Sequence, residues 1–129
     1  VLSAVFDPGQ LLAAQTLIRR MPVGDAVMEL ILDLVRAFRP DDSSAPAVVA
    51  ENMRWGPGPR AAQALMLAVR AQALLRGAFS PSAAAVADLA SAVLNHRMAL
   101  GFGARARGVT QLELIADVTE AVVQQKAVA

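Results

Sequence analysis

The sequence contains no cysteine, one histidine and one lysine among its 129 residues. The lack of cysteine excludes disulfides and thiolate metal sites, and a lone His96 excludes a site built on a histidine pair. The single lysine, Lys126, stands near the end of the chain, so no glycine-rich loop ends in the Lys-Ser/Thr of a phosphate-binding P-loop. No apolar strand ends in paired acids either. We therefore expect no metal, no bound cofactor and no nucleotide hydrolysis in this chain alone.

Net charge and long apolar runs are also scarce. The formal charge is +1, which gives no bulk attraction to nucleic acid or to a membrane surface. No uncharged run exceeds 11 residues, whereas spanning a bilayer takes about 20. The apolar run Leu11–Ile18 lies inside an amphipathic pattern, so it is not a signal peptide. We expect a cytoplasmic chain with no membrane span and no nucleic-acid partner.

Aromatic residues make up 4% of the chain and hydrophobic residues 56%, much of the latter alanine. This balance favours closely packed helices over sheet, and 129 residues fit one domain with its own core. The predicted fold class is all-α: a small bundle of five to six helices in a single domain, residues 1–129. Periodicity, prolines and caps place the helices as follows: Pro8–Arg20, Asp25–Arg39, Ala47–Arg54, Pro59–Gly77, Pro81–Asn95 and Gln111–Gln125.

Two of these helices show which side chains should face the core. The helix from Asp25 has the clearest amphipathic pattern, and the helix from Pro59 has apolar positions almost all round, which is typical of the centre of a bundle. The positions expected to face inward in the first two helices are Leu11, Ala14, Leu17, Ile18, Val27, Leu30, Ile31, Leu34, Val35 and Phe38.

The remaining segments are short. Val1–Phe6 fits an edge strand or an extended lead-in, and residues 97–100 fit a second short strand that would pair with it and close the ends of the fold. Gly101–Gly108 is predicted to be a flexible basic loop, solvated unless its arginines touch a partner. Its Gly-x-Gly-x-x-Ala pattern lacks the βαβ setting of a dinucleotide site.

The segment Trp55-Gly-Pro-Gly-Pro-Arg60 carries the most specific chemistry. Pro59 suits the first turn of a helix, which makes Gly58 the N-cap. Arg60 then lies beside the positive end of the helix dipole, which is unfavourable by roughly 0.3–1 kcal/mol when exposed. An anion there would be favoured by the free N–H groups and by the guanidinium. Residue patterns leave two interpretations: a phosphate contact, or an exposed arginine whose stem covers Trp55 or a neighbour. Trp55 itself is expected to pack in the core or between helices.

The same segment, Trp55-Gly-Pro-Gly-Pro-Arg-Ala-Ala-Gln-Ala-Leu65, resembles the Gly-x-Ser-Pro-Arg-Ala segment in the C-terminal helical lid of MoxR-type AAA+ ATPases. The resemblance covers most of the chain. It continues in Met21-Pro-Val-Gly-Asp25, Leu34-Val-Arg-Ala-Phe-Arg-Pro40, Ala71-Gln-Ala-Leu-Leu-Arg-Gly77, Ser80-Pro-Ser82, Val86-Ala-Asp-Leu-Ala90, Val93-Leu-Asn-His-Arg97 and Gly108-Val-Thr110. The order and spacing of these pieces make the resemblance specific.

This resemblance implies that the chain is a C-terminal piece of a larger bacterial ATPase. Arg60 would be its catalytic sensor 2 arginine, reaching the γ-phosphate of ATP, and Gly58, Pro59 and Arg60 would be the segment that meets the nucleotide. ATP with Mg would be held by a preceding α/β core domain. Neighbouring subunits of a ring, commonly a hexamer, and proteins with von Willebrand factor A-type domains are the partners implied, in chaperone-like remodelling.

The sequence departs from the family pattern at two places. Gly58 stands where the family usually has serine, and Ala83 and Ala84 stand where it often has acids. Two other functions stay open: a non-catalytic helical protein-interaction domain, and a helix-turn-helix DNA binder. The second needs clustered polar residues on a recognition helix, and Arg60, Gln63 and Arg70 supply few of them.

Overall fold

The computed structural model describes residues 3–128 and is mostly α-helical, as the composition predicts. Seven α-helices, a short 3₁₀ turn and a two-stranded antiparallel sheet lie within these residues. In chain order they are α1 (Pro8–Arg20), α2 (Asp25–Ala37), α3 (Ala47–Asn52), β1 (Met53–Trp55), α4 (Pro59–Leu75), α5 (Ala83–Leu94), η1 (Asn95–Arg97), β2 (Ala99–Leu100), α6 (Phe102–Ala106) and α7 (Gln111–Val128).

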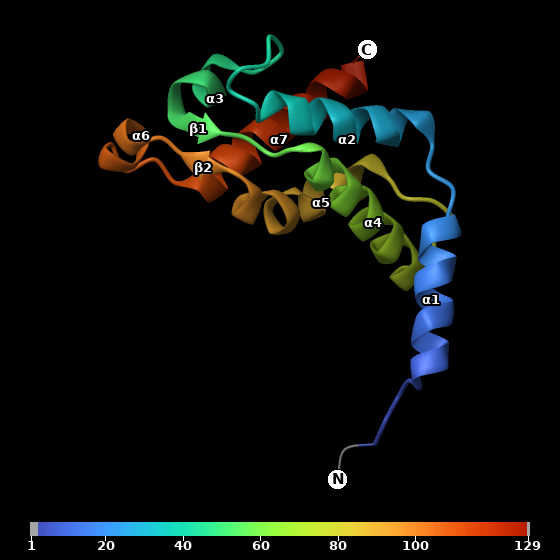
Figure 1. Ribbon diagram of the computed structural model, residues 1–129. Helices are drawn as coiled ribbons and strands as arrows, with labels where there is room; N and C mark the ends of the chain where they lie inside the picture. The colour runs from blue at the N-terminus through green and yellow to red at the C-terminus, as the bar shows by residue number, and fades with distance from the viewer. Residues whose placement is uncertain (1–2, 129) are drawn as a thin grey trace.

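Four helices form the core (Figure 1). Contacts link α4 to α5, α5 to α7, α7 to α2 and α2 back to α4, so that each helix buries a face against two neighbours. The interior is aliphatic and closely packed, and it includes Phe38, which is fully buried at the end of α2. The inward positions predicted for α2 are confirmed: Leu30, Ile31, Leu34 and Val35 are buried and Val27 is partly buried.

The small sheet pairs different segments from those predicted. Residues 99–100 do form a strand, but its partner is β1, with Met53 opposite Leu100 and Trp55 opposite Ala99. The prediction of a strand at the N-terminus is wrong for residues 3–6, which are irregular, and Val1 and Leu2 lie outside the described residues. The sheet and the short helices α3 and α6 form one end of the molecule (Figure 1).

The basic segment predicted to be a flexible loop contains helix α6, so that prediction is wrong. Its arginines hold this end of the fold together. Arg105 donates to the Leu100 carbonyl at 2.9 Å, and Arg107 donates to the side-chain oxygen of Asn52 at 2.8 Å. Asn52 is 8% exposed and donates to the Val48 carbonyl, so this buried amide has a partner at each end.

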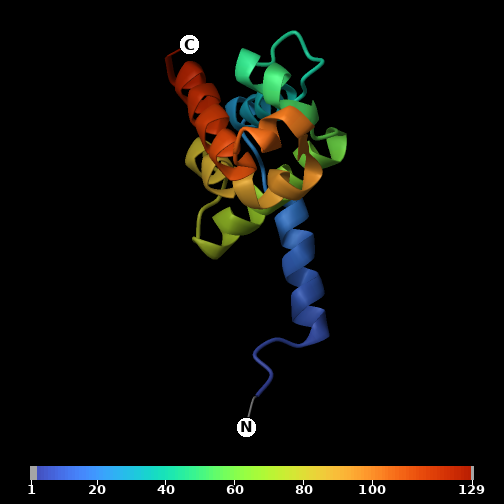
Figure 2. The same cartoon turned by 90° about the vertical axis from the view of Figure 1, so that its left-hand side faces the viewer.

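Helix α1 lies at the opposite end and projects from the bundle (Figure 2). It starts as predicted, with a capping box between Asp7 and Gln10. The prediction that Leu11 and Leu17 face a core is wrong, because both are 53% exposed and no residue of α1 is fully buried. Amphipathicity shows that a helix has an apolar face, but not that the chain itself covers that face.

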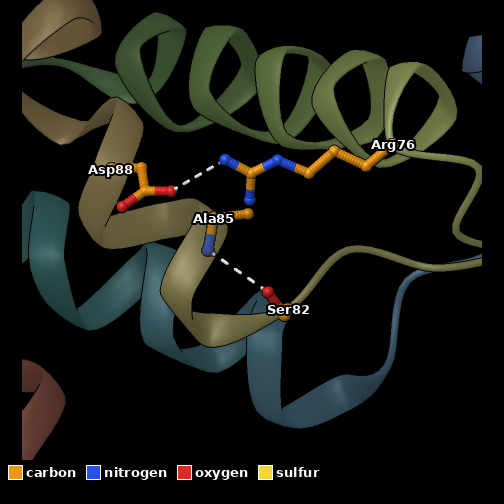
Figure 3. Close-up of polar contacts among 4 residues, drawn as sticks. All are labelled: Arg76, Ser82, Ala85 and Asp88. Atoms are coloured by element: carbon orange, nitrogen blue, oxygen red, sulfur yellow. Dashed lines mark hydrogen bonds and ion pairs between the residues drawn. The ribbon is translucent and has the colours of Figure 1, made fainter.

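The turn between α4 and α5 is defined by three local features, of which Figure 3 shows the two side-chain contacts. Gly77 ends α4 with a φ of 69°, a left-handed conformation that glycine adopts without a steric penalty. The Ser82 hydroxyl accepts a hydrogen bond from the Ala85 N–H and caps α5. Arg76 and Asp88 form an ion pair at 3.2 Å across the turn. These features join the end of α4 to the start of α5, which packs against it.

Candidate functional site: the start of helix α4

The turn before α4 is fixed by backbone packing against the end of α2. A Cβ atom added to Gly56 would lie 2.0 Å from the Phe38 carbonyl oxygen, so only glycine fits at this position. Pro57 is fully buried, and its carbonyl accepts a hydrogen bond from Nε of Arg39 at 3.1 Å. These contacts determine where α4 begins and in which direction it runs.

The first turn of α4 matches the prediction from its sequence. Gly58 is the N-cap with extended backbone, Pro59 occupies the first helical position, and the Ala61 N–H donates to the Gly58 carbonyl at 2.9 Å. No side chain caps this end. Free backbone N–H groups therefore remain at the positive end of a helix of 17 residues, which favours a negatively charged ligand.

Arg60 follows directly and is exposed. Within residues 3–128, no carboxylate forms an ion pair with it and no acceptor takes a hydrogen bond from its guanidinium. The guanidinium and the helix start thus place positive charge at one exposed point, where no acid within residues 3–128 forms an ion pair with Arg60. That arrangement is suited to an oxyanion such as a phosphate.

A shallow hollow of about 400 Å³ adjoins this point, between the end of α2 and residues 55–58. The prediction that Trp55 packs in the core is wrong: its side chain is 49% exposed and lines the hollow with Arg39. Asp42 also lines it. The Ser44 hydroxyl and N–H both donate to the Asp42 carboxylate, at 2.6 and 2.9 Å, and these bonds lower its pKa.

The other residues that the sequence suggested as functional candidates do not come together in one site in the structure. Gln63 is exposed on the same helix as Arg60, whereas Arg70 turns toward α1 and donates to the Arg19 carbonyl at 3.4 Å. His96 is exposed in the 3₁₀ turn after α5. Residues 3–128 contain no group of three potential metal ligands, and none of their helices is long and apolar enough to cross a membrane.

Sequence reasoning missed one residue of this site, Arg39. Its side chain holds the turn that precedes Arg60 from a position 18 residues away from Pro57. The only signal in the sequence was its place in the segment Leu34–Pro40, which belongs to the family resemblance. That segment did not indicate which backbone group the guanidinium binds, because the contact depends on tertiary packing.

Comparison with known proteins gives one family and one similar structure. A family model described as the AAA lid domain matches residues 46–118. A solved structure described as a "putative ATPase" from Cytophaga hutchinsonii superimposes with a TM-score of 0.81 at 22% sequence identity. The alignment covers 87% of this chain and 34% of that one, so this chain spans about a third of that protein's length. Curated proteins gave no match.

The matched range runs from the residue before α3 to the middle of α7 and includes the whole of β1, α4, α5 and α6. It therefore contains residues 55–58 and Arg60 of the candidate site, though not Arg39 or Asp42, and three of the four core helices in whole or in part. The chain belongs to the AAA lid domain family.

Proposed function

We propose that this chain is the lid of a MoxR-type AAA+ ATPase and that Arg60 is its sensor 2 arginine. The observation that carries the proposal is the exposed cation at the uncapped, positive end of α4. Such an arrangement is unfavourable without an anion, and the γ-phosphate of ATP supplies one. Gly58 and Pro59 contribute by leaving the helix start open to the nucleotide.

In this proposal the α/β core domain binds ATP with Mg, and the lid closes over it. Membership of the AAA lid family implies association with such a core domain, typically in an oligomer. Arg60 would stabilise charge on the transferring phosphoryl group, as arginines do in other phosphoryl-transfer sites. The lid would move after hydrolysis, and this movement would be transmitted to neighbouring subunits in a ring, commonly a hexamer. The ring would then remodel other proteins in the cytoplasm, as a chaperone does. Proteins with von Willebrand factor A-type domains would be among its partners.

The test is Arg60→Ala in the intact ATPase. Loss of a charge-assisted hydrogen bond of about 1.5–3 kcal/mol in the transition state lowers hydrolysis roughly 10- to 100-fold. Arg36→Ala, which removes an exposed arginine on α2, serves as the control and should leave hydrolysis unchanged. Circular dichroism checks that both variants fold. Unchanged turnover in Arg60→Ala would reject the sensor role and favour a non-catalytic interaction domain.

A further inference from the structure

The end of the molecule formed by the small sheet and α6 carries basic residues that the candidate site does not use. Figure 2 views this end directly. Residues 95–109, from η1 through β2 and α6, contain three arginines, one histidine and no aspartate or glutamate. Arg54 adds a further arginine from β1, the strand paired with β2. We call this surface the basic end, and it comprises Arg54, His96, Arg97, Phe102, Arg105 and Arg107.

The fold holds two of these guanidinium groups in place. Arg105 and Arg107 are exposed, and each uses one nitrogen for its bond to the Leu100 carbonyl or to Asn52. A Cβ added to Gly103 would lie 3.3 Å from Nη1 of Arg107, so this guanidinium lies close to the backbone of α6. No carboxylate within residues 3–128 forms an ion pair with either group. A planar guanidinium that is already positioned loses little freedom when it binds a carboxylate.

An exposed aromatic ring lies beside these charges. Phe102, the first residue of α6, is 86% exposed, and it directly precedes the Gly103 backbone that Arg107 approaches. Val48, on the neighbouring helix α3, is 43% exposed. Aromatic residues and arginine are the side chains most enriched in protein interfaces. The basic end therefore offers both a surface for an apolar residue and partners for carboxylates.

The acids around the basic end limit the size of a ligand that fits it. Exposed carboxylates lie on α3 and on α7, which contacts η1: Glu51, Glu113, Asp117 and Glu120. A nucleic acid that continued past the arginines along α7 would be repelled by these carboxylates, and the formal charge of the whole chain is only +1. A short acidic segment of a protein needs to contact the arginines alone.

We propose that the basic end is a docking surface for an acidic segment of another protein, in which an apolar residue lies beside the carboxylates. The carboxylates bind Arg54, Arg105 and Arg107, and the apolar residue covers Phe102. This inference goes beyond nucleotide sensing, because none of these residues belongs to the candidate site. It holds whether or not Arg60 meets a phosphate.

Binding of a defined peptide to the 129-residue chain tests the proposal. The probe is a fluorescent peptide that repeats Gly-Glu-Leu-Asp, and its neutral counterpart repeats Gly-Gln-Leu-Asn. We expect fluorescence anisotropy to show saturable binding of the acidic peptide only. That binding should weaken as salt is added, because salt screens exposed charges. Absence of binding by the acidic peptide rejects the proposal.

Two pairs of variants distinguish a local site from attraction by net charge. Arg54→Glu and Arg20→Glu change the net charge equally, and Phe102→Ala and Phe79→Ala remove rings that are 86% and 92% exposed. Arg20 and Phe79 line a hollow at the opposite end, where α1 meets the α4–α5 turn. We expect Arg54→Glu and Phe102→Ala to weaken peptide binding roughly tenfold, and the two control variants to leave it unchanged. Urea midpoints check that all four variants fold.

Other outcomes of the same measurements overturn the proposal. Equal weakening by Arg54→Glu and Arg20→Glu means that the peptide follows net charge and has no site. Tighter binding of a thymidine oligonucleotide than of the acidic peptide, lost in Arg54→Glu, makes the ligand a nucleic acid. Preference for vesicles that contain phosphatidylserine makes it a membrane surface.

Two further outcomes would assign the basic end to the protein itself. Self-association of the chain that Arg54→Glu abolishes makes the occupant a second copy. Peptide binding by the 129-residue chain that is lost in the intact ATPase shows that the rest of the ATPase covers this end. Either result overturns the proposed partner. None of these measurements depends on hydrolysis, so their failure is distinct from that of the Arg60→Ala test.

Discussion

At the scale of single residues, the start of α4 depends on two glycines with opposite surroundings. A Cβ on Gly56 meets three backbone atoms within 3 Å, whereas a Cβ on Gly58 meets nothing within 4 Å. Gly58 has extended backbone with φ −87°, which any residue adopts. Only the first glycine is therefore required by the fold, and the second position has room for a side chain such as that of serine.

This contrast predicts opposite effects of two substitutions. Gly56→Ala forces the turn away from α2 and breaks the Arg39–Pro57 bond, so it should destabilise the chain by about 1–3 kcal/mol. Gly58→Ser restricts the unfolded chain and adds an N-cap oxygen, so it should stabilise by about 0.5–1 kcal/mol. Urea unfolding at constant m-value measures both. Equal midpoints for the two variants would contradict the packing described for Gly56.

At the scale of elements, the α4–α5 turn contains two polar contacts of unequal value (Figure 3). The ion pair of Arg76 and Asp88 is exposed, at 58% and 51% of the two side chains, and such pairs contribute about 0.2–1 kcal/mol or less. The Ser82 cap satisfies a helix N–H, and losing a cap costs typically about 1 kcal/mol. Ser82→Ala should therefore lower the urea midpoint more than Asp88→Ala does. The reverse order would show that the ion pair holds the turn.

Lys126 joins the C-terminal part of α7 to α2 through Asp33 and Glu29, at 2.8 and 3.3 Å. The hydrogen bond to Asp33 is the largest cause that raises the pKa of Lys126 above 10.5. Burial opposes this increase, and the hydrogen bond to Glu29 adds a smaller contribution to it. A raised pKa stabilises the folded chain fully below pH 10.5. That contribution is lost as the pH rises through the folded-state value.

The composition of the chain leaves few other side chains that titrate in the pH range where Lys126 loses its proton. The chain has no cysteine, no tyrosine and no second lysine, and arginine stays charged up to about pH 12. Stability should therefore be level from about pH 9 to 10 and fall as Lys126 loses its proton. The free energy of unfolding of the Lys126→Met variant should stay constant over the whole alkaline range. Urea midpoints of both proteins across the alkaline range provide the measurement, and parallel curves would exclude the link between α2 and α7.

The elements that the sequence predicted correctly are those set by local chemistry. Caps, prolines and the 3.6-residue period lie within a few residues of one another, so α1, α2 and α4 begin where the sequence predicts. Helix α5 begins two residues later than the predicted start at Pro81, because Ser82 is its cap. The strand pair depends on contact between Met53 and Leu100, and nothing local to residues 53–55 specifies that partner. The contact of Gly56 with Phe38 is likewise tertiary. The sequence therefore indicated Arg60 but not what holds it in place.

At the scale of the whole molecule, the helical bundle and α1 differ in how much they contribute to the buried core. The family match begins at residue 46, after both α1 and α2. Helix α2 is nevertheless integral, since five of its residues are buried in the common core. Helix α1 contributes no buried residue and packs mainly along α4. The stability of the lid thus resides in α2, α4, α5 and α7, and α1 is available for another contact.

This division predicts that a chain starting at Met21 still folds cooperatively. Met21 is buried and stays, while the loss comprises the partial burial of Ala14 and Ile18, their packing against α4 and the Arg70–Arg19 bond. Half the value of burying one isoleucine is about 1–1.5 kcal/mol, so the free energy of unfolding should fall by roughly 1–2 kcal/mol. Urea unfolding compares the two chains. Loss of the cooperative transition would place α1 in the folding core, whereas a small loss of stability leaves its exposed leucines to be explained by a partner.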